Sequence, residues 1–104
     1  ILKSIQIIQE RTSKISYSQF KKDGEKHESI TFRIAIIGEA VNRLNKHIPL
    51  SKKYPEIDWK GIISMRNFLI HEYDDIDLSV IWQTIQKELS PLKTSCEKIL
   101  EDLN

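Results

Sequence analysis

The chain has 104 residues, of which 39% are hydrophobic and 30% are charged, with 16 Lys and Arg against 15 Asp and Glu. This length suffices for one hydrophobic core, and the composition excludes a disordered or membrane-embedded protein. A formal charge of +1 gives no general attraction to polyanions, so any contact with RNA must be local. No apolar run approaches the roughly 20 residues that span a bilayer, and no secretory signal pattern is present, so we expect a cytoplasmic protein with no membrane partner.

The first half of the chain contains two stretches in which apolar residues recur at helical spacing. The stripe Leu2–Ile15 predicts a helix that ends before the polar stretch at residues 16–23. The longer stripe Ile30–Ile48 predicts the most regular helix, which begins near Glu25. The chain opens at Ile1 without a methionine and already in helical periodicity, so we expect some sequence to precede it.

A row of small or short residues, Ala35, Gly38 and Asn42, follows a neighbouring face of the second predicted helix. A glycine inside a helix costs about 1 kcal/mol relative to alanine, so some contact should offset it. We interpret the row as close packing within the bundle; the alternative is a subunit or ligand contact.

Two further helices are predicted in the second half of the chain. Residues 47–58 contain two prolines and form a connection, and Asp58 caps a third helix from Trp59 to about Tyr73, apolar on several sides and therefore central. Asp77 then caps a last helix with an apolar stripe that extends to Leu103.

Pro91 interrupts that last stripe, so we expect either a kink there or a restart with Ser90 as the cap. The sequence therefore predicts an all-α fold, a four- to five-helix up-and-down bundle, that forms a single domain over residues 1–104.

Cysteine and histidine are too sparse for a metal centre. Cys96 is the only cysteine, which excludes an intrachain disulfide and suits a reducing cytoplasm. His27, His47 and His71 lack the spacing that places two ligands on one helix face. We therefore expect no bound metal and no cofactor.

Four polar side chains lie on the third predicted helix. At about 100° per residue Asn67 and His71 follow each other on one face, while Arg66 and Tyr73 share another. Arg66 offers a permanent positive charge shaped for phosphate oxygens, and a histidine such as His71 can exchange a proton near neutral pH. Such a pair suffices for phosphodiester cleavage without a metal. In the structural alternative, Arg66 pairs with carboxylates, His71 bonds a backbone carbonyl and Tyr73 packs in the core.

The segment Arg66–Tyr73 resembles the Arg-x4-His-x-Tyr motif of HepT-like toxins, a branch of the HEPN domains. Ile37–Leu44 is similar to the Ile-Gly-Glu-Ala segment of that family. Two further segments, Ile57–Ile63 and Met65–Asn67, resemble the residues that lead into the family's motif. The resemblance extends from about Ile5 to Leu92 and implies an HEPN-type bundle. After the motif the family often has a bulky residue, whereas this chain has Asp74 and Asp75. Negative charge there would repel RNA if it faced the cleft. Alternatively, the two carboxylates stabilise the protonated form of His71, or they form a solvated turn, which is the interpretation we favour.

The resemblance implies an endoribonuclease in which the ribose 2′-hydroxyl attacks the adjacent phosphorus and leaves a 2′,3′-cyclic phosphate. In this scheme His71 moves the proton as general base or acid, and Arg66 stabilises the charge that grows on the phosphate. Asn67 orients His71 or a phosphate oxygen. DNA is excluded as a substrate because it lacks the 2′-hydroxyl nucleophile.

The resemblance also implies protein partners. HEPN ribonucleases typically work as two-fold homodimers, so that two Arg66 and two His71 line one cleft. Lys60 and Arg43 are candidates to extend this cleft, but the sequence does not predict their direction. HepT-like proteins are toxins of a type VII-like toxin–antitoxin pair, whose antitoxin, a minimal nucleotidyltransferase, transfers AMP to the tyrosine at the position of Tyr73. In the competing interpretation the chain is a catalytically inactive dimerisation and partner-binding module of a nucleotidyltransferase complex. A less favoured third interpretation is a nucleotide-binding accessory domain.

Overall fold

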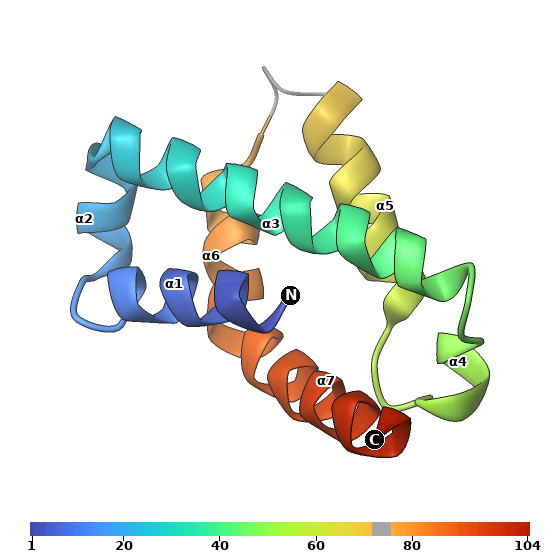
Figure 1. The fold of residues 1–104 in the computed structure, drawn as a ribbon. Helices are drawn as coiled ribbons and strands as arrows, with labels where there is room; N and C mark the ends of the chain where they lie inside the picture. Colours follow the sequence, from blue (N-terminus) through green and yellow to red (C-terminus); the bar gives the residue numbers. More distant parts are fainter. Residues whose placement is uncertain (72–75) are drawn as a thin grey trace.

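The computed structural model describes residues 1–71 and 76–104, and helices make up most of this part of the chain (Figure 1). In chain order the helices are α1 (Leu2–Thr12), α2 (Tyr17–Lys22), α3 (Gly24–Asn45), α4 (Leu50–Lys53), α5 (Trp59–His71), α6 (Leu78–Lys87) and α7 (Leu89–Leu103). The described residues contain no strand. The predicted all-α class is therefore confirmed, and the four predicted helical stretches correspond to α1, α3, α5 and the pair α6–α7.

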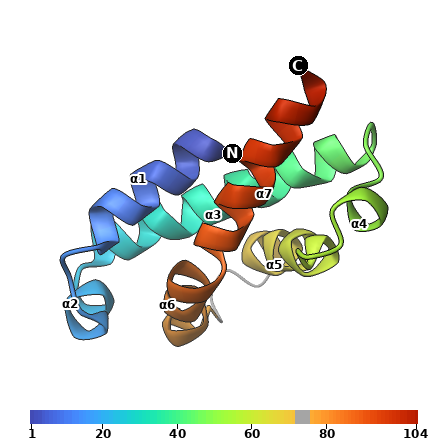
Figure 2. The same ribbon diagram turned by 90° about the horizontal axis from the view of Figure 1, so that it is seen from below.

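Helix α3 is the longest helix and lies at the centre of the arrangement. Helix α1 runs beside α3 in the opposite direction, and α5 crosses α3 in the most extensive helix pair of the fold (Figure 1). Seen from below, α7 lies against α1 and continues from α6, which lies between α2 and α5 (Figure 2). None of the described helices combines the length and apolar character that a membrane span requires.

One hydrophobic core joins these helices. Its large side chains are fully buried and come from most of the helices. The largest are Ile5, Ile8, Phe20, Ile30, Val41, Leu50, Trp59 and Ile81. At about 25 cal/mol per Å² of buried apolar surface, such burial is the main favourable contribution to folding.

Helix α2 lies within the polar stretch at residues 16–23, for which the sequence analysis predicted no element, and α1 ends before this stretch as expected. Ser16 and Gln19 form a capping box, in which Ser16 Oγ accepts from the Gln19 amide at 3.2 Å and Gln19 Oε1 accepts from the Ser16 amide at 2.9 Å. Phe20 is fully buried, with its ring 5.1 Å from that of Trp82 on α6. Two local hydrogen bonds and the burial of one aromatic ring thus stabilise α2, which is too short to show a periodic pattern of apolar residues.

The connection at residues 47–58 contains the single turn of α4 and positions α5. The Asp58 carboxylate accepts a hydrogen bond from the Gly61 amide at 3.0 Å, which confirms the predicted cap. Trp59 Nε1 donates to the Tyr54 carbonyl at 2.8 Å, and Tyr54 Oη donates to Asp102 at 2.6 Å. These bonds tie the start of α5 to the end of α7.

The last predicted helix is divided into α6 and α7. Asp77 caps α6, because its carboxylate accepts from the Ser79 amide at 2.9 Å, as predicted. The break falls at Glu88, so Ser90 is not the cap of α7. Instead, Ser90 Oγ accepts from Gln9 Nε2 of α1 at 3.3 Å, and Pro91 lies in the first turn, where a missing amide hydrogen is tolerated.

Candidate functional site

Helices α3 and α5 approach each other closely at Gly38. A β-carbon on Gly38 would lie 2.3 Å from Arg66 Cβ and 3.2 Å from the Ile62 carbonyl oxygen, so no larger residue fits without movement. Close packing, the interpretation preferred for the row of small residues, is confirmed at this position. The contact with α5 offsets the cost of a glycine within α3.

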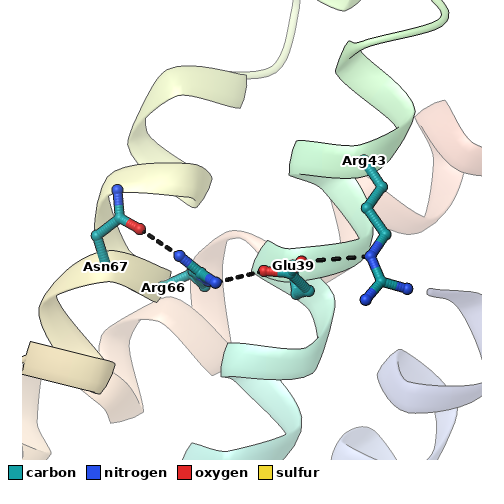
Figure 3. Close-up of polar contacts among 4 residues, drawn as sticks. All are labelled: Glu39, Arg43, Arg66 and Asn67. Carbon is teal, nitrogen blue, oxygen red and sulfur yellow. Dashed lines mark hydrogen bonds and ion pairs between the residues drawn. The ribbon is translucent and has the colours of Figure 1, made fainter.

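Arg66 projects from α5 toward α3 and forms a chain of polar contacts there (Figure 3). Its Nη2 lies 2.5 Å from Oε2 of Glu39, the residue that follows Gly38, and its Nη1 donates to Asn67 Oδ1 at 2.7 Å. Glu39 Oε1 also accepts from Nε of Arg43 at 3.2 Å. Glu39 therefore lies between two guanidinium groups, and Arg66 pairs with a carboxylate as the structural alternative predicted.

Two atoms of this cluster are buried without an aligned hydrogen-bond partner among the residues that the structure describes. They are Arg66 Nε and Glu39 Oε2; the latter contacts Arg66 Nη2 as an ion pair. Burial of incompletely bonded charged groups opposes folding. Burial of these two atoms therefore offsets part of the free energy that the ion pairs of the cluster contribute.

Arg66 and Glu39 also line an open groove of about 710 Å³ between α3, α5 and the start of α6. Much of its wall is apolar and faces solvent, since Phe32 is 65% exposed and Ile70 is 51% exposed. The expectation that α5 is central is therefore only partly met: Trp59 and Leu69 are buried, but one side of the helix is not covered. A cationic side chain at an uncovered apolar groove suits an anionic ligand or a second protein surface.

The other predicted site residues lie near the end of α5. Asn67 is exposed and accepts the Arg66 hydrogen bond. His71 is exposed, one helical turn after Asn67. The structure thus brings Arg66 and Asn67 into contact. His71 lies on the same helix as these two residues. Tyr73, like Asp74 and Asp75, lies outside the described residues.

Sequence reasoning missed Glu39 as a site residue, although it noted the segment that contains it. The sequence did contain a feature that could have identified it. Glu39 directly follows Gly38, and a glycine within a helix lowers helix stability unless a close contact compensates for it. Arg43, for which no direction was predicted, is directed toward Glu39. Within the described part of the chain, no three His, Cys, Asp or Glu side chains gather as metal ligands would.

Comparison with known proteins identifies the family. The family described as "Ribonuclease HepT-like" matches residues 1–99. A protein from Caldanaerobacter subterraneus subsp. tengcongensis named "Putative RNase TTE0752" is 37% identical over 97% of this chain and 88% of its own length. "Probable ribonuclease HepT" from Thermococcus cleftensis is 34% identical over 95% of this chain and 88% of its own length.

A longer relative shows that the same unit occurs inside a larger protein. "Gamma-glutamylcyclotransferase and putative RNase MJ0434" from Methanocaldococcus jannaschii is 35% identical over all of this chain, which covers 46% of that protein. Among solved structures, none matches the chain. The family match over nearly the whole length, together with two relatives covered over most of their own length, shows that the chain belongs to the HepT-like ribonuclease family.

Proposed function

We propose that this protein is an endoribonuclease that cleaves RNA without a metal ion, with Arg66 and His71 as its catalytic residues. The observation that carries the proposal is the position of Arg66 at the wall of the groove. Its guanidinium contacts Glu39 through one terminal nitrogen and Asn67 through the other. Each terminal nitrogen carries two N–H groups, so one on each is left to bind phosphate oxygens.

The proposed reaction uses the ribose as its own nucleophile. His71 accepts the proton of the 2′-hydroxyl, whose oxygen attacks the adjacent phosphorus, or returns a proton to the departing 5′-oxygen. Arg66 stabilises the negative charge that grows on the phosphate oxygens. The P–O5′ bond breaks, and the products are a 2′,3′-cyclic phosphate and a 5′-hydroxyl. The exposed position of His71 supports this role, because an RNA strand can reach the imidazole.

Two copies of the chain form the proposed active unit. The exposed apolar side chains of the groove, Phe32, Ile36 and Ile70, supply a surface that a second copy can cover, and a two-fold axis places identical patches together. In such a dimer two Arg66 side chains lie near one interface. The local positive charge then exceeds what the formal charge of +1 per chain suggests.

The proposed biological role is that of a cytoplasmic toxin in a type VII-like toxin–antitoxin pair. A cognate minimal nucleotidyltransferase transfers AMP to Tyr73 and so silences cleavage. The added phosphate carries about one negative charge, which competes with RNA for Arg66, and the adenosine narrows access to the cleft.

Purified protein incubated with RNA in EDTA tests the enzymatic part of this proposal. We expect cleavage by the wild type, with cyclic phosphate ends, and a loss of about 10²–10⁴-fold in Arg66→Ala and His71→Ala with unchanged helical circular dichroism. Asn67→Ala should have a milder effect, and His47→Ala, a second exposed histidine, should have none. If the folded wild type leaves RNA intact, the competing function, a helical module that dimerises and binds a nucleotidyltransferase, replaces the proposal.

A further inference from the structure

We infer that Glu39 is a positioning residue that holds the Arg66 guanidinium ready for the transition state and, at the same time, weakens ground-state binding of RNA. This inference rests on the proposed ribonuclease function and adds to it a further side chain, from a different helix. It makes a specific kinetic prediction. Loss of the positioning effect should lower kcat, and loss of the repulsion between the carboxylate and RNA should lower KM, whereas a purely structural role would not lower both.

The first step of the argument is that both ends of the Arg66 side chain are restrained. At its base, Cβ lies against Gly38, in the space that a β-carbon there would require. At its tip, Glu39 holds Nη2 and Asn67 holds Nη1. An arginine loses much rotamer freedom when it binds a phosphate, and here part of that loss has already occurred on folding.

The second step concerns which donors remain. Arg66 Nε is buried, so RNA cannot reach it, and the terminal nitrogens Nη1 and Nη2 carry the accessible N–H groups. Because Glu39 and Asn67 engage these two nitrogens, they determine the direction of the N–H groups that are left over. Preorganised donors act on the transition state without reorganisation at the moment of reaction.

The third step is the charge of Glu39. Its side chain is 34% exposed and lines the groove beside Arg66, so the carboxylate repels a phosphate that approaches there. Its other oxygen holds Arg43, which is 75% exposed. Glu39 therefore reduces the attraction of two arginines for RNA while it orients one of them. Loss of the carboxylate should tighten RNA binding and slow the chemical step.

The experiment compares steady-state cleavage of a single-site fluorogenic RNA by the wild type, Glu39→Ala and Glu39→Gln. In Glu39→Ala we expect kcat to fall about 10–100-fold, by analogy with the loss of other transition-state contacts, and KM to fall rather than rise. Glu39→Gln retains a carbonyl acceptor for Arg66 without the negative charge. Its kcat should recover to within about tenfold of the wild type, while its KM stays low. Glu25→Gln, an exposed glutamate in the first turn of the same helix, is the matched control for lost charge.

Arginine side-chain ¹⁵N NMR supplies a readout that does not depend on cleavage. The restrained guanidinium of Arg66 should give separate, slowly exchanging Nη signals in the wild type and in Glu25→Gln, and averaged signals in Glu39→Ala. If the wild type shows these signals but cuts no RNA, the proposed function fails and the restraint of Arg66 stands. The inference is overturned if Glu39→Ala retains wild-type kcat and KM, if its kcat rises, or if Arg66 rotates freely in the wild type. Should Glu39→Ala not fold, Glu39→Gln decides through its KM and its Nη signals.

Discussion

The β-carbon of Arg66 occupies the space that a side chain on Gly38 would need. Since Arg66 Cβ is rigidly attached to the α5 backbone, a methyl group at position 38 must push α3 and α5 apart. The crowding costs about 1–3 kcal/mol, whereas the gain in helix propensity is at most about 1 kcal/mol. Gly38→Ala should therefore lower the free energy of unfolding by up to about 2 kcal/mol, measured by urea titration.

The same substitution has a matched control at the start of α3. A β-carbon on Gly24 would meet only the far end of the His27 side chain, at 4.0 Å, so Gly24→Ala should leave stability unchanged or slightly raised. If Gly38→Ala is as stable as Gly24→Ala, the tight approach of α3 and α5 is not present in solution.

Dimerisation is predicted to depend on the exposed side of the α3–α5 groove. Light scattering at micromolar concentration should give about twice the 12.2 kDa mass of one chain. Phe32→Asp should give monomers, because a carboxylate at the interface would be buried without a partner. Leu100→Asp, which alters an exposed apolar residue on α7, should leave the dimer intact. A monomeric wild type, or a dimer that tolerates Phe32→Asp, would contradict the assignment of this surface.

Control by AMP transfer is predicted to depend on the Tyr73 hydroxyl. Co-expression with a nucleotidyltransferase encoded beside the gene should raise the mass of the chain by whole AMP units, as measured by intact-protein mass spectrometry. Tyr73→Phe should remove this increase and leave cleavage largely intact, so that the variant is toxic even with the partner present. A wild type that is silenced without any gain in mass would show instead that the partner acts by occlusion.

The cap of α6 is predicted to make stability depend on pH in the acid range. Hydrogen bonds from the Ser79 hydroxyl and amide hold the pKa of Asp77 below its ordinary value of 3.8. Since the folded state binds the proton less tightly, this contribution is complete above the unfolded pKa and is lost as the pH falls through the folded value. Wild type should therefore exceed Asp77→Asn in urea midpoint at neutral pH, and the difference should disappear between about pH 5 and pH 2.

A substitution elsewhere on the surface separates this effect from general acid sensitivity. Glu97→Gln, which alters an exposed carboxylate on α7, should follow the wild-type pH dependence. A constant difference between wild type and Asp77→Asn at every pH would mean that the Asp77 charge adds nothing to the cap.

The sequence by itself determined the features whose energies are local. Helical periodicity predicted α1, α3 and α5, and the capping residues Asp58 and Asp77 were predicted correctly, because each bond joins residues only two or three positions apart. The resemblance of the Arg66–Tyr73 segment identified the family for a similar reason, because all residues of the motif lie close together in the sequence and can be recognised without knowledge of the fold. Short α2 was not predicted, since six residues are too few for periodicity and the burial of Phe20 depends on α6.

Only the tertiary structure decided which side chains contact another helix and which face solvent. The pairing of Arg66 with Glu39 requires α5 to cross α3 at Gly38, and no local pattern encodes the angle or position of that crossing. Likewise, the spacing of apolar residues cannot tell whether another helix covers them, and so Phe32 and Ile70 were assigned to helices without any indication that they face solvent. Contacts between residues distant in sequence depend on packing of the whole chain, and these contacts created both the Arg66 cluster and the apolar groove beside it.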